Sequence, residues 1–215
     1  MKRGAANRVG RAIAITVRPL TKRDWPVIEQ LFGDKGACGG CWCMVWRLRS
    51  GKEWEANKGE PNRRAFQKLV ETGAAHGVLA FAGDECVGWC NIGPKSDFKR
   101  LRDSRVLRTD TTDDPWSVTC FYVPAKWRGK GVGGKLLAGA VELARAKKAR
   151  ALEGYPVPQK SASAIPAAFA WTGVKPLFTK ARFTASKRAA GLRPVYVKRL
   201  SASSARANPF GGAAC

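Results

Sequence analysis

The sequence predicts a single mixed α/β domain in which helices flank a sheet. Its 215 residues are enough to bury one substantial core, and 45% of them are hydrophobic. Short apolar segments of strand type alternate along the chain with segments of helical periodicity. Two of the strand-type segments flank Gly83-Asp84-Glu85 and predict a hairpin, so part of the sheet is antiparallel.

The elements are expected in the following order. Residues 12–17 form a first strand, and a helix runs to Phe32 from Thr21, which forms a capping box with Asp24. A second helix covers 61–70 and precedes the hairpin strands 77–82 and 86–92. After a charged loop, the remaining elements are a central strand over 116–123, a helix from Gly131, a strand from Ala151 to Gly154, a helix over 167–178 interrupted at Gly173 and Pro176, and a last strand over 194–200.

The chain divides into three parts by composition. Residues 1–11 are basic and contain glycine, and we expect them to form a flexible arm. Residues 12–200 carry all the predicted elements and form the folded domain. Residues 201–215 are small and polar, which predicts a disordered tail.

A basic glycine loop, Arg128-Gly-Lys-Gly-Val-Gly-Gly134, stands between the central strand and the next helix. Glycine lets a ligand approach the backbone closely, and a helix N-terminus offers free N–H groups and a partial positive charge. Arg128 and Lys130 add full charges. The loop is therefore suited to bind an anion such as a pyrophosphate.

Two common phosphate-binding patterns fit this loop poorly. The Walker A pattern fits until Leu136, which stands where a hydroxyl should bind magnesium. The dinucleotide pattern G-x-G-x-x-G fits Gly129, Gly131 and Gly134. That pattern, however, has its first glycine directly after the strand, whereas residues 124–128 intervene here.

The loop instead resembles motif A of the GNAT (GCN5-related) N-acetyltransferase superfamily. The signature of that motif is Gln or Arg, two residues, Gly, one residue, and Gly or Ala, and it is met by Arg128, Gly131 and Gly133. The order of elements over 12–200 is similar to the family as well. The resemblance makes 12–200 an acetyltransferase domain. It implies an α/β (α+β) fold with a mixed, mostly antiparallel central sheet that is flanked by helices and splayed at its central strands.

The resemblance also implies a ligand, its contacts and a reaction. Acetyl-CoA is the expected co-substrate, with its pantetheine arm beside the central strand and its pyrophosphate on the loop. The residues expected to bind it are Phe121, Val123, Arg128, Gly129, Lys130, Gly131, Val132 and Gly133. The expected reaction is acetyl transfer to a primary amine of a small molecule or a protein, by direct attack in a ternary complex.

The catalytic groups depart from the usual pattern of the family. The central strand carries no carboxylate, so Glu153 on the next strand is the candidate general base, with a structural ion pair as an equal alternative. In a later segment that resembles the family's L-Y-x-x-x-G-F, Phe178 replaces a tyrosine that often acts as general acid, and Arg182 replaces the glycine. Tyr122, Tyr155 or water is left to donate a proton.

The cysteines and tryptophans raise two further alternatives. The candidate zinc ligands are Cys38, Cys41 and Cys43, with Cys86 or Cys90 as a fourth. Their spacing does not match two standard C-x-x-C pairs, so we expect no metal and a glycine-rich, aromatic loop near the acceptor pocket. The nearby Trp42, Trp46 and Trp54 either line that pocket or pack in the core. Cys120 could accept the acyl group as a nucleophile, but a buried packing role is favoured.

The charge of the chain favours anionic partners. Its formal net charge is +23, from 39 Lys and Arg against 16 Asp and Glu. Because the basic residues are spread along the chain, nucleic acid is an alternative partner that is not favoured, and a homodimer is left open. The acidic cluster of Asp110, Asp113 and Asp114 either attracts a cationic amine or only solvates its loop.

No apolar run reaches the roughly 20 residues of a transmembrane helix, and the N-terminus lacks a secretion signal. We therefore expect a soluble cytoplasmic protein with reduced thiols and no membrane partner. Two other functions stay open. One is acylation of an RNA-linked target such as aminoacyl-tRNA, which the charge favours. The other is a basic binding module that keeps the fold without catalysis, which the missing carboxylate and tyrosine favour.

Overall fold

The computed structural model describes residues 14–111, 114–158, 170–187 and 194–201. The expected arm over 1–11, and all of the expected tail except Ser201, lie outside the described residues, as does Asp113. None of the helices in the described ranges has the length and apolar character needed to cross a bilayer.

One mixed sheet organises the described part of the chain. Its seven strands are β1 (Ile15–Pro19), β2 (His76–Ala82), β3 (Glu85–Pro94), β4 (Trp116–Tyr122), β5 (Ala151–Gly154), β6 (Thr184–Ala185) and β7 (Tyr196–Arg199). They lie in the order β1-β2-β3-β4-β5-β7-β6. Only β4 and β5 pair in parallel, and the other neighbours are antiparallel. The expected fold class is therefore confirmed.

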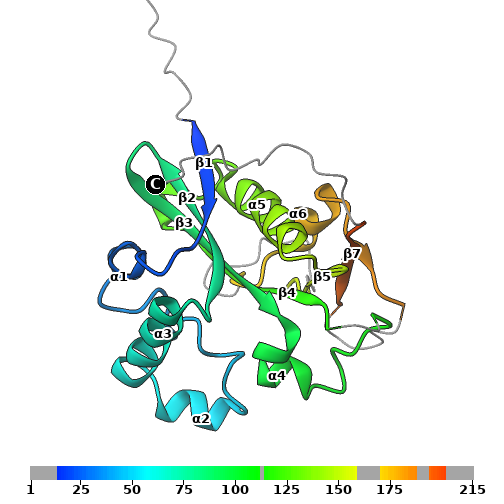
Figure 1. The fold of residues 1–215 in the computed structure, drawn as a ribbon, viewed down its shortest axis with the longest axis horizontal. Coiled ribbons are helices and arrows are strands. Elements are labelled where there is room, and N and C mark those ends of the chain that lie inside the picture. Colours follow the sequence, from blue (N-terminus) through cyan, green and yellow to red (C-terminus); the bar gives the residue numbers. More distant parts are fainter. Residues whose placement is uncertain (1–13, 112–113, 159–169, 188–193, 202–215) are drawn as a thin grey trace, which may run out of the picture.

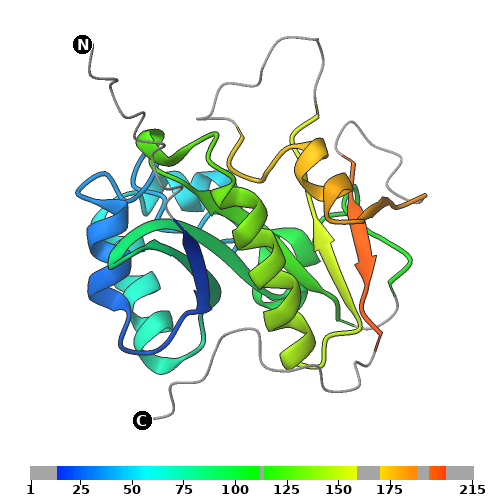
Figure 2. The ribbon, with the colours of Figure 1, turned by 90° about the horizontal axis from the view of Figure 1, so that it is seen from above.

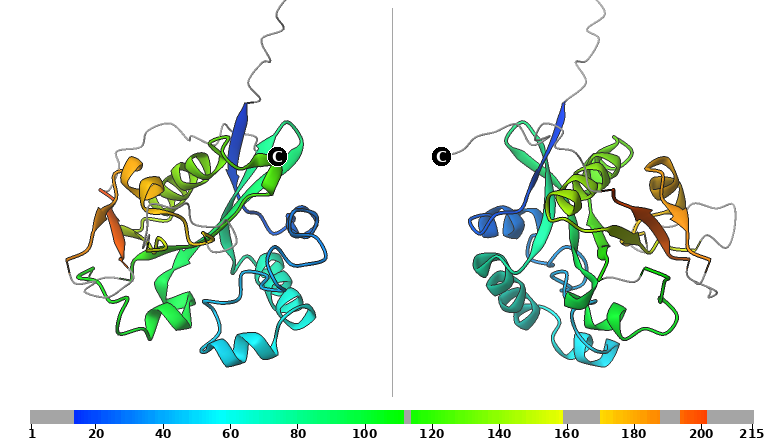
Figure 3. Two further views of the ribbon diagram at one scale, coloured as in Figure 1. Left: turned by 180° about the vertical axis from the view of Figure 1, so that it is seen from behind. Right: turned by 45° about the vertical axis from the view of Figure 1, so that its right-hand side comes forward.

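Helices cover both faces of this sheet (Figure 1). They are α1 (Trp25–Phe32), α2 (Gly51–Ala56), α3 (Glu60–Thr72), α4 (Lys99–Arg102), α5 (Val132–Ala146) and α6 (Lys175–Lys180), with 3₁₀ turns η1 (Lys95–Asp97) and η2 (Ala125–Trp127). In the view of Figure 1, α5 lies above the strands and α2, α3 and α4 lie below them. Figures 2 and 3 show the same layers from above, from behind and from the side.

The long helix α5 packs closely on the sheet because its inner face is apolar and includes a glycine. Leu136, Leu137 and Ala140 are fully buried in the core on this side. A Cβ added at Gly139 would lie only 2.9 Å from Val78 Cγ1, which is closer than van der Waals contact allows. Glycine at this position therefore lets the helix backbone approach β2 and fixes where its N-terminus lies.

The central strands splay apart after a short paired segment. β5 pairs with β4 only over Trp116, Ser117 and Val118, while β4 continues to Tyr122. The β3–β4 register shifts at the same point, because Asn91 faces Cys120 and Ile92 faces Val118. Thr119 is therefore a bulged residue, and a bulge bends its strand. The gap between β4 and β5 opens at this bulge.

An aromatic ring from α6 fills one side of the gap. Phe178 is fully buried, and its ring lies edge-on to Phe121 of β4 at a centroid distance of 6.3 Å. A Cβ added at Gly154 of β5 would lie 2.1 Å from the same ring. Phe178 thus packs between the two diverging strands, in a place with no room for a second side chain.

Two local expectations were wrong. The helix expected from Thr21 begins at Trp25, because the Asp24 carboxylate accepts bonds from the Thr21 N–H (2.6 Å) and from Arg18 (2.6 and 2.7 Å). These bonds hold the pKa of Asp24 below its ordinary value, although burial alone would raise it. Residues 170–174 are not helical, and α6 starts at Lys175, where Pro176 suits a first turn. Residues 167–169 lie outside the described ranges.

Helix α2 was not predicted, although the sequence carries its signal. The Ser50 hydroxyl accepts a bond from the Glu53 N–H (3.1 Å), and the Glu53 carboxylate accepts one from the Arg49 N–H (2.7 Å). Serine followed by glutamate three residues later is the pattern of a capping box. Noting this pattern among the nearby glycines and tryptophans would have located the helix.

Candidate active site

The basic loop joins the end of β4 to the N-terminus of α5. Gly129 and Gly131 have φ angles of 74° and 80°, which are left-handed values that glycine adopts without strain. Gly131 is the residue before the helix, and its carbonyl accepts the first intrahelical bond, from the Lys135 N–H (3.2 Å). The N–H groups of residues 132–134 thus precede the first helical donor and are free to meet a ligand. The loop has the geometry of an anion site.

Arg128 ties the loop back to the strand. Its Nε donates a hydrogen bond to the carbonyl of Val123 (2.9 Å). Lys130 points elsewhere, and its Nζ lies 4.9 Å from the centre of the Trp127 ring. Trp127 in turn donates from Nε1 to the Glu85 carboxylate (3.3 Å). Lys130 therefore belongs to the outer surface of the loop.

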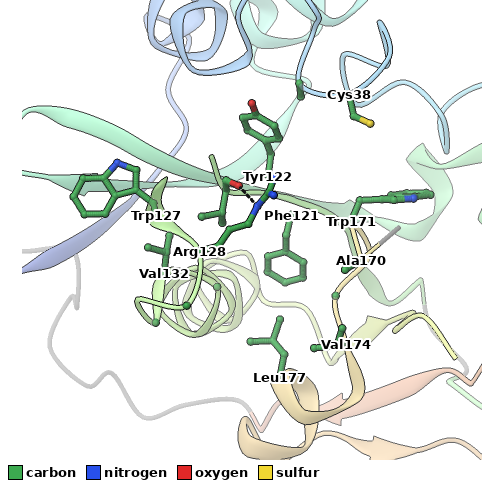
Figure 4. Close-up of a pocket in the computed structure, with 16 residues that line it drawn as sticks. Cys38, Phe121, Tyr122, Trp127, Arg128, Val132, Ala170, Trp171, Val174 and Leu177 are labelled. Carbon is green, nitrogen blue, oxygen red and sulfur yellow. Dashed lines mark hydrogen bonds between the residues drawn. The ribbon is translucent and has the colours of Figure 1, made fainter. Parts of the chain in front are cut away.

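A cavity of about 430 Å³ runs from this loop along the gap beside β4 (Figure 4). Its lining residues are Ala37, Cys38, Phe121, Tyr122, Val123, Trp127, Arg128, Gly129, Gly131, Val132, Gly133, Ala170, Trp171, Gly173, Val174 and Leu177. Seven of the eight residues expected to bind the co-substrate are among them, and Lys130 is the exception. We refer to this space as the loop cavity.

The exposed edge of β4 offers backbone groups to the loop cavity. The Phe121 N–H points away from β3 and donates to the carbonyl of Trp171 (2.6 Å). Because N–H groups alternate along a strand, Val123 presents its own N–H on the same edge. The carbonyl of Thr119 accepts from the Trp46 indole (3.2 Å). In Figure 4, the Phe121 and Tyr122 side chains project from β4 in opposite directions.

A second cavity of about 430 Å³ adjoins the first. It is lined by Ala37, Cys38, Cys41, Cys43, Val45, Gly51, Trp54, Glu55, Arg100, Cys120, Phe121, Tyr122 and Trp171. The two cavities share Ala37, Cys38, Phe121, Tyr122 and Trp171. We call the second one the acceptor-side cavity. Trp54 lines it, whereas Trp42 and Trp46 are buried in the core.

Four thiols lie on the wall of the acceptor-side cavity, and the surroundings of two of them, Cys41 and Cys120, disfavour the reactive thiolate. Burial raises the pKa of the Cys41 thiol to about 11. A hydrogen bond with Cys43, together with burial, holds the pKa of Cys120 well above its ordinary value. The thiolate is the reactive form, so Cys120 holds little of it near neutral pH. Among the described residues, no three His, Cys, Asp or Glu side chains are arranged to hold a metal ion.

Glu153 lies on neither cavity and is fully engaged by other groups. Its side chain is completely buried, and Lys95 Nζ lies 2.8 Å from Oε2. The Tyr155 hydroxyl donates to the same oxygen (2.7 Å), and the Thr109 and Thr111 hydroxyls donate to Oε1. The geometry favours the structural ion pair over a general base, with Lys95 as the partner.

The structure also places the other residues that the sequence singled out, two tyrosines, Arg182 and two aspartates. Tyr155 is fully buried and bonded to Glu153, whereas Tyr122 lines both cavities. Arg182 has a φ of 60°, so its place in the chain demands the left-handed backbone that glycine adopts most easily. Asp114 binds the backbone N–H of Ser96 (3.0 Å), and Asp110 lines a different cavity, so neither lies on the acceptor side.

The loop of Cys38, Cys41 and Cys43 lines the acceptor-side cavity, in line with the expected loop near an acceptor pocket, whereas the segment over 170–177 was not predicted as a cavity wall. Trp171 and Leu177 line the loop cavity from across the gap. Their contribution follows from the β4–β5 splay and not from any local pattern. Gly173, with a φ of 87°, was the available signal that this stretch is a turn and not a helix.

Comparison with known proteins agrees with this architecture. An N-acetyltransferase from Staphylococcus aureus Mu50 superposes with a TM-score of 0.51 and 16% identity, covering 86% of this chain and 98% of that one. The PaiA N-acetyltransferase of Thermoplasma acidophilum, solved with coenzyme A, gives 0.51 and 14%, covering 87% and 99%. A protein of the GNAT family from Desulfovibrio desulfuricans gives 0.50 and 17%, covering 86% and 99%. At these identities the likeness shows the fold alone.

Comparison by sequence gives the family. No match was found among curated protein sequences. The sequence model of the acetyltransferase (GNAT) family matches residues 44–165, which is more than half of the chain. The matched range contains β4, the basic loop, α5 and β5. This chain therefore belongs to the acetyltransferase (GNAT) family.

Proposed function

We propose that this protein transfers an acetyl group from acetyl-CoA to a primary amine, by direct attack of the amine while both substrates are bound. The observation that carries the proposal is the meeting of two cavities at Phe121 and Tyr122, with an anion-suited loop at the outer end of one of them. The loop suits a diphosphate, the loop cavity suits the extended pantetheine arm, and the acceptor-side cavity suits the amine substrate.

The chain's own groups suggest how the co-substrate is held. The free N–H groups of residues 132–134 and the dipole of α5 suit the diphosphate. The N–H groups of Phe121 and Val123 suit amide carbonyls of the pantetheine arm, as the Trp171 carbonyl on the Phe121 N–H already illustrates. An arm bound at Phe121 would have to displace that carbonyl.

The transfer breaks the thioester C–S bond, forms an amide C–N bond and moves one proton from the amine to the departing sulfur. Among the described residues on the two cavity walls, Glu55 is the only carboxylate, and it lies 2.6 Å from Lys58 Nζ. The amine must also lose a proton before it attacks, and we assign that proton to solvent and not to Glu153. Tyr122, whose side chain lines both cavities, is the proposed proton donor to the thiolate.

The reaction is tested by mixing the protein with acetyl-CoA and a panel of primary amines and measuring free thiol. We expect amine-dependent thiol release, and initial-rate lines that intersect when both substrates are varied. Parallel lines would indicate an acetylated enzyme and would return Cys120 to the mechanism. Tight coenzyme binding without thiol release from any amine would instead support a binding module.

A second candidate, an acceptor carried by RNA, is favoured by the distribution of acidic residues. Only Glu142 and Glu153 follow Asp114, against 18 of the 39 lysines and arginines. Glu153 is buried, and Glu142 pairs with Arg145 at 2.6 Å. The basic residues are spread along the chain as expected, but the carboxylates that would balance them are not. The excess of positive charge is therefore concentrated on the elements from β4 onward.

Part of this excess positive charge lines a polar cavity of about 450 Å³ at the β6–β7 edge of the sheet. Its wall combines one carboxylate, that of Asp110, with the cations Arg182, Lys187, Lys198 and Arg199 and the hydroxyls of Thr109, Thr111, Thr184 and Ser186. Burial, and then the neighbouring charges of Arg145 and Arg182, lower the pKa of Lys198. Cations and hydroxyls are the groups that contact phosphates in nucleic-acid complexes.

Salt dependence tests this second candidate. If RNA binds at this edge, the logarithm of the binding constant should fall linearly with the logarithm of the salt concentration. Replacing Arg182 and Arg199 by glutamine should then reduce the slope by about 1.4, or about 0.7 for each lost phosphate contact. The same double change at the exposed Lys52 and Lys68, on α2 and α3, is the matched control. Equal slopes in the two variants would reject an RNA site at this edge.

A further inference from the structure

The acceptor-side cavity combines an aromatic wall with one unpaired cation. Trp54, Tyr122 and Trp171 supply large rings, and Val45 and the thiols add further apolar surface. Two side chains on the wall carry full charges, Glu55 and Arg100. A mostly apolar cavity with a small number of charged groups is typical of sites that orient a small molecule.

The two charged groups differ in how they are satisfied. Glu55 is bound to Lys58, whose Nζ also lies 4.5 Å from the centre of the Trp54 ring. Arg100 has no acidic partner among the described residues. By contrast, Arg102, two positions along the same short helix, lies 2.7 Å from Asp103. The guanidinium of Arg100 is thus available to an anion in the cavity.

Arg100 is also held in place from the loop that forms the other wall. Its backbone N–H donates to the Trp46 carbonyl (3.1 Å), and its guanidinium carbon lies 5.9 Å from the centre of the Trp46 ring. A Cβ added at Gly51, itself on the cavity wall, would lie 3.7 Å from Arg100 Nη2. These contacts place the guanidinium at the cavity wall, where a carboxylate could bind it through two parallel hydrogen bonds.

We propose, resting on the function proposed above, that the acceptor is a free aromatic α-amino acid. Its carboxylate binds Arg100, its ring packs on the aromatic wall, and its amine faces the junction at Phe121 and Tyr122. The amine nitrogen forms the amide bond as the thioester C–S bond breaks, and the amine proton is delivered to the sulfur. A cationic polyamine is disfavoured, because Arg100 repels a second positive charge. An amino acid esterified to RNA lacks the free carboxylate that Arg100 would hold.

The test compares two acceptors that differ only in the carboxylate, L-phenylalanine and phenethylamine, in the wild type and in Arg100→Gln. We expect Arg100→Gln to raise KM for L-phenylalanine by about 10- to 100-fold, the value of a charge-assisted pair. KM for phenethylamine should change less than about 2-fold, since that amine never meets the guanidinium. Arg102→Gln, on the same helix but paired with Asp103, is the matched control and should leave both values unchanged.

Binding of L-phenylalanine to the coenzyme-loaded protein, followed through the protein's tryptophan fluorescence, gives a readout that needs no turnover. The same 10- to 100-fold loss of affinity is expected in Arg100→Gln alone. An equal response of both acceptors to Arg100→Gln would overturn the inference and leave the proposed acetyl transfer standing. A wild type that prefers phenethylamine would do the same. Failure to bind the coenzyme at all would reject both.

Discussion

Replacing Gly133 by glutamine is expected to lower the affinity for coenzyme A by at least about 100-fold, because the new side chain fills the proposed diphosphate site. Gly133 lines the loop cavity in the first turn of α5, and a Cβ there would meet only Leu177 Cδ1, at 3.9 Å. The backbone at this position is not left-handed, so the change adds bulk without strain. Glutamine is also a better helix former than glycine, so thermal stability should not fall. Calorimetric titration with coenzyme A measures the effect.

Gly134 offers a matched control one residue further along the same turn. It is exposed, it does not line the loop cavity, and an added Cβ there meets nothing within 4 Å. Gly134→Gln keeps the backbone N–H that we assign to the diphosphate and adds its side chain outside the cavity, so it should bind coenzyme A within a few-fold of the wild type. If the two variants lost affinity equally, general disturbance of the helix start would explain both. If neither lost affinity, the loop would not be the binding site.

Glu153→Gln is expected to lower the free energy of unfolding by about 3–5 kcal/mol, the cost of leaving one partner of a buried ion pair alone. The carboxylate is fully buried, and its partner Lys95 is 13% exposed, so water cannot replace the lost charge. Lys95 would keep its bond to the Leu107 carbonyl (3.0 Å), but its charge would no longer face a carboxylate. The network also ties Thr109 and Thr111 to β5, so the loop before β4 should loosen as well. Chemical denaturation measures the loss.

The rate of acetyl transfer separates a structural role from a catalytic one. We expect the rate per folded molecule of Glu153→Gln to stay within a few-fold of the wild type, since Glu153 touches neither cavity. Asp103→Asn, which breaks the exposed pair with Arg102, is the control for a surface interaction and should leave stability nearly unchanged. A variant as stable as the wild type but inactive by several orders of magnitude would restore Glu153 as the general base.

The parts of the fold that could be predicted are those with strong local patterns. The apolar stripe of α5 and the hairpin around Gly83-Asp84-Glu85 appear where periodicity and turn residues placed them. The glycine loop was located for the same reason, because the anion site that we propose for it needs a local run of glycine and basic residues. Seven of the eight residues predicted to contact the co-substrate line one cavity.

The acceptor side could be predicted only in part, as the cysteine-containing loop and Trp54, because distant segments build the rest. Arg100 comes from α4, Trp54 from α2 and Trp171 from the turn before α6, and nothing in the local sequence links them. The sequence left the role of Glu153 between two alternatives for a similar reason. A lone carboxylate in an apolar strand is equally compatible with a base and with an ion pair until the tertiary structure supplies Lys95. Local sequence patterns predict helices and strands, whereas the role of a side chain depends on the tertiary contacts between those elements.

A crystal structure of the protein soaked with coenzyme A tests the central claim most directly. We predict that the diphosphate lies against the N–H groups of residues 132–134 and that the pantetheine arm follows β4 past Val123 toward Tyr122. We also predict that the thiol end lies where the two cavities meet. Nucleotide density at any other place, with the Gly129–Gly134 loop and the gap beside β4 unoccupied, would contradict the proposed function and everything inferred from it.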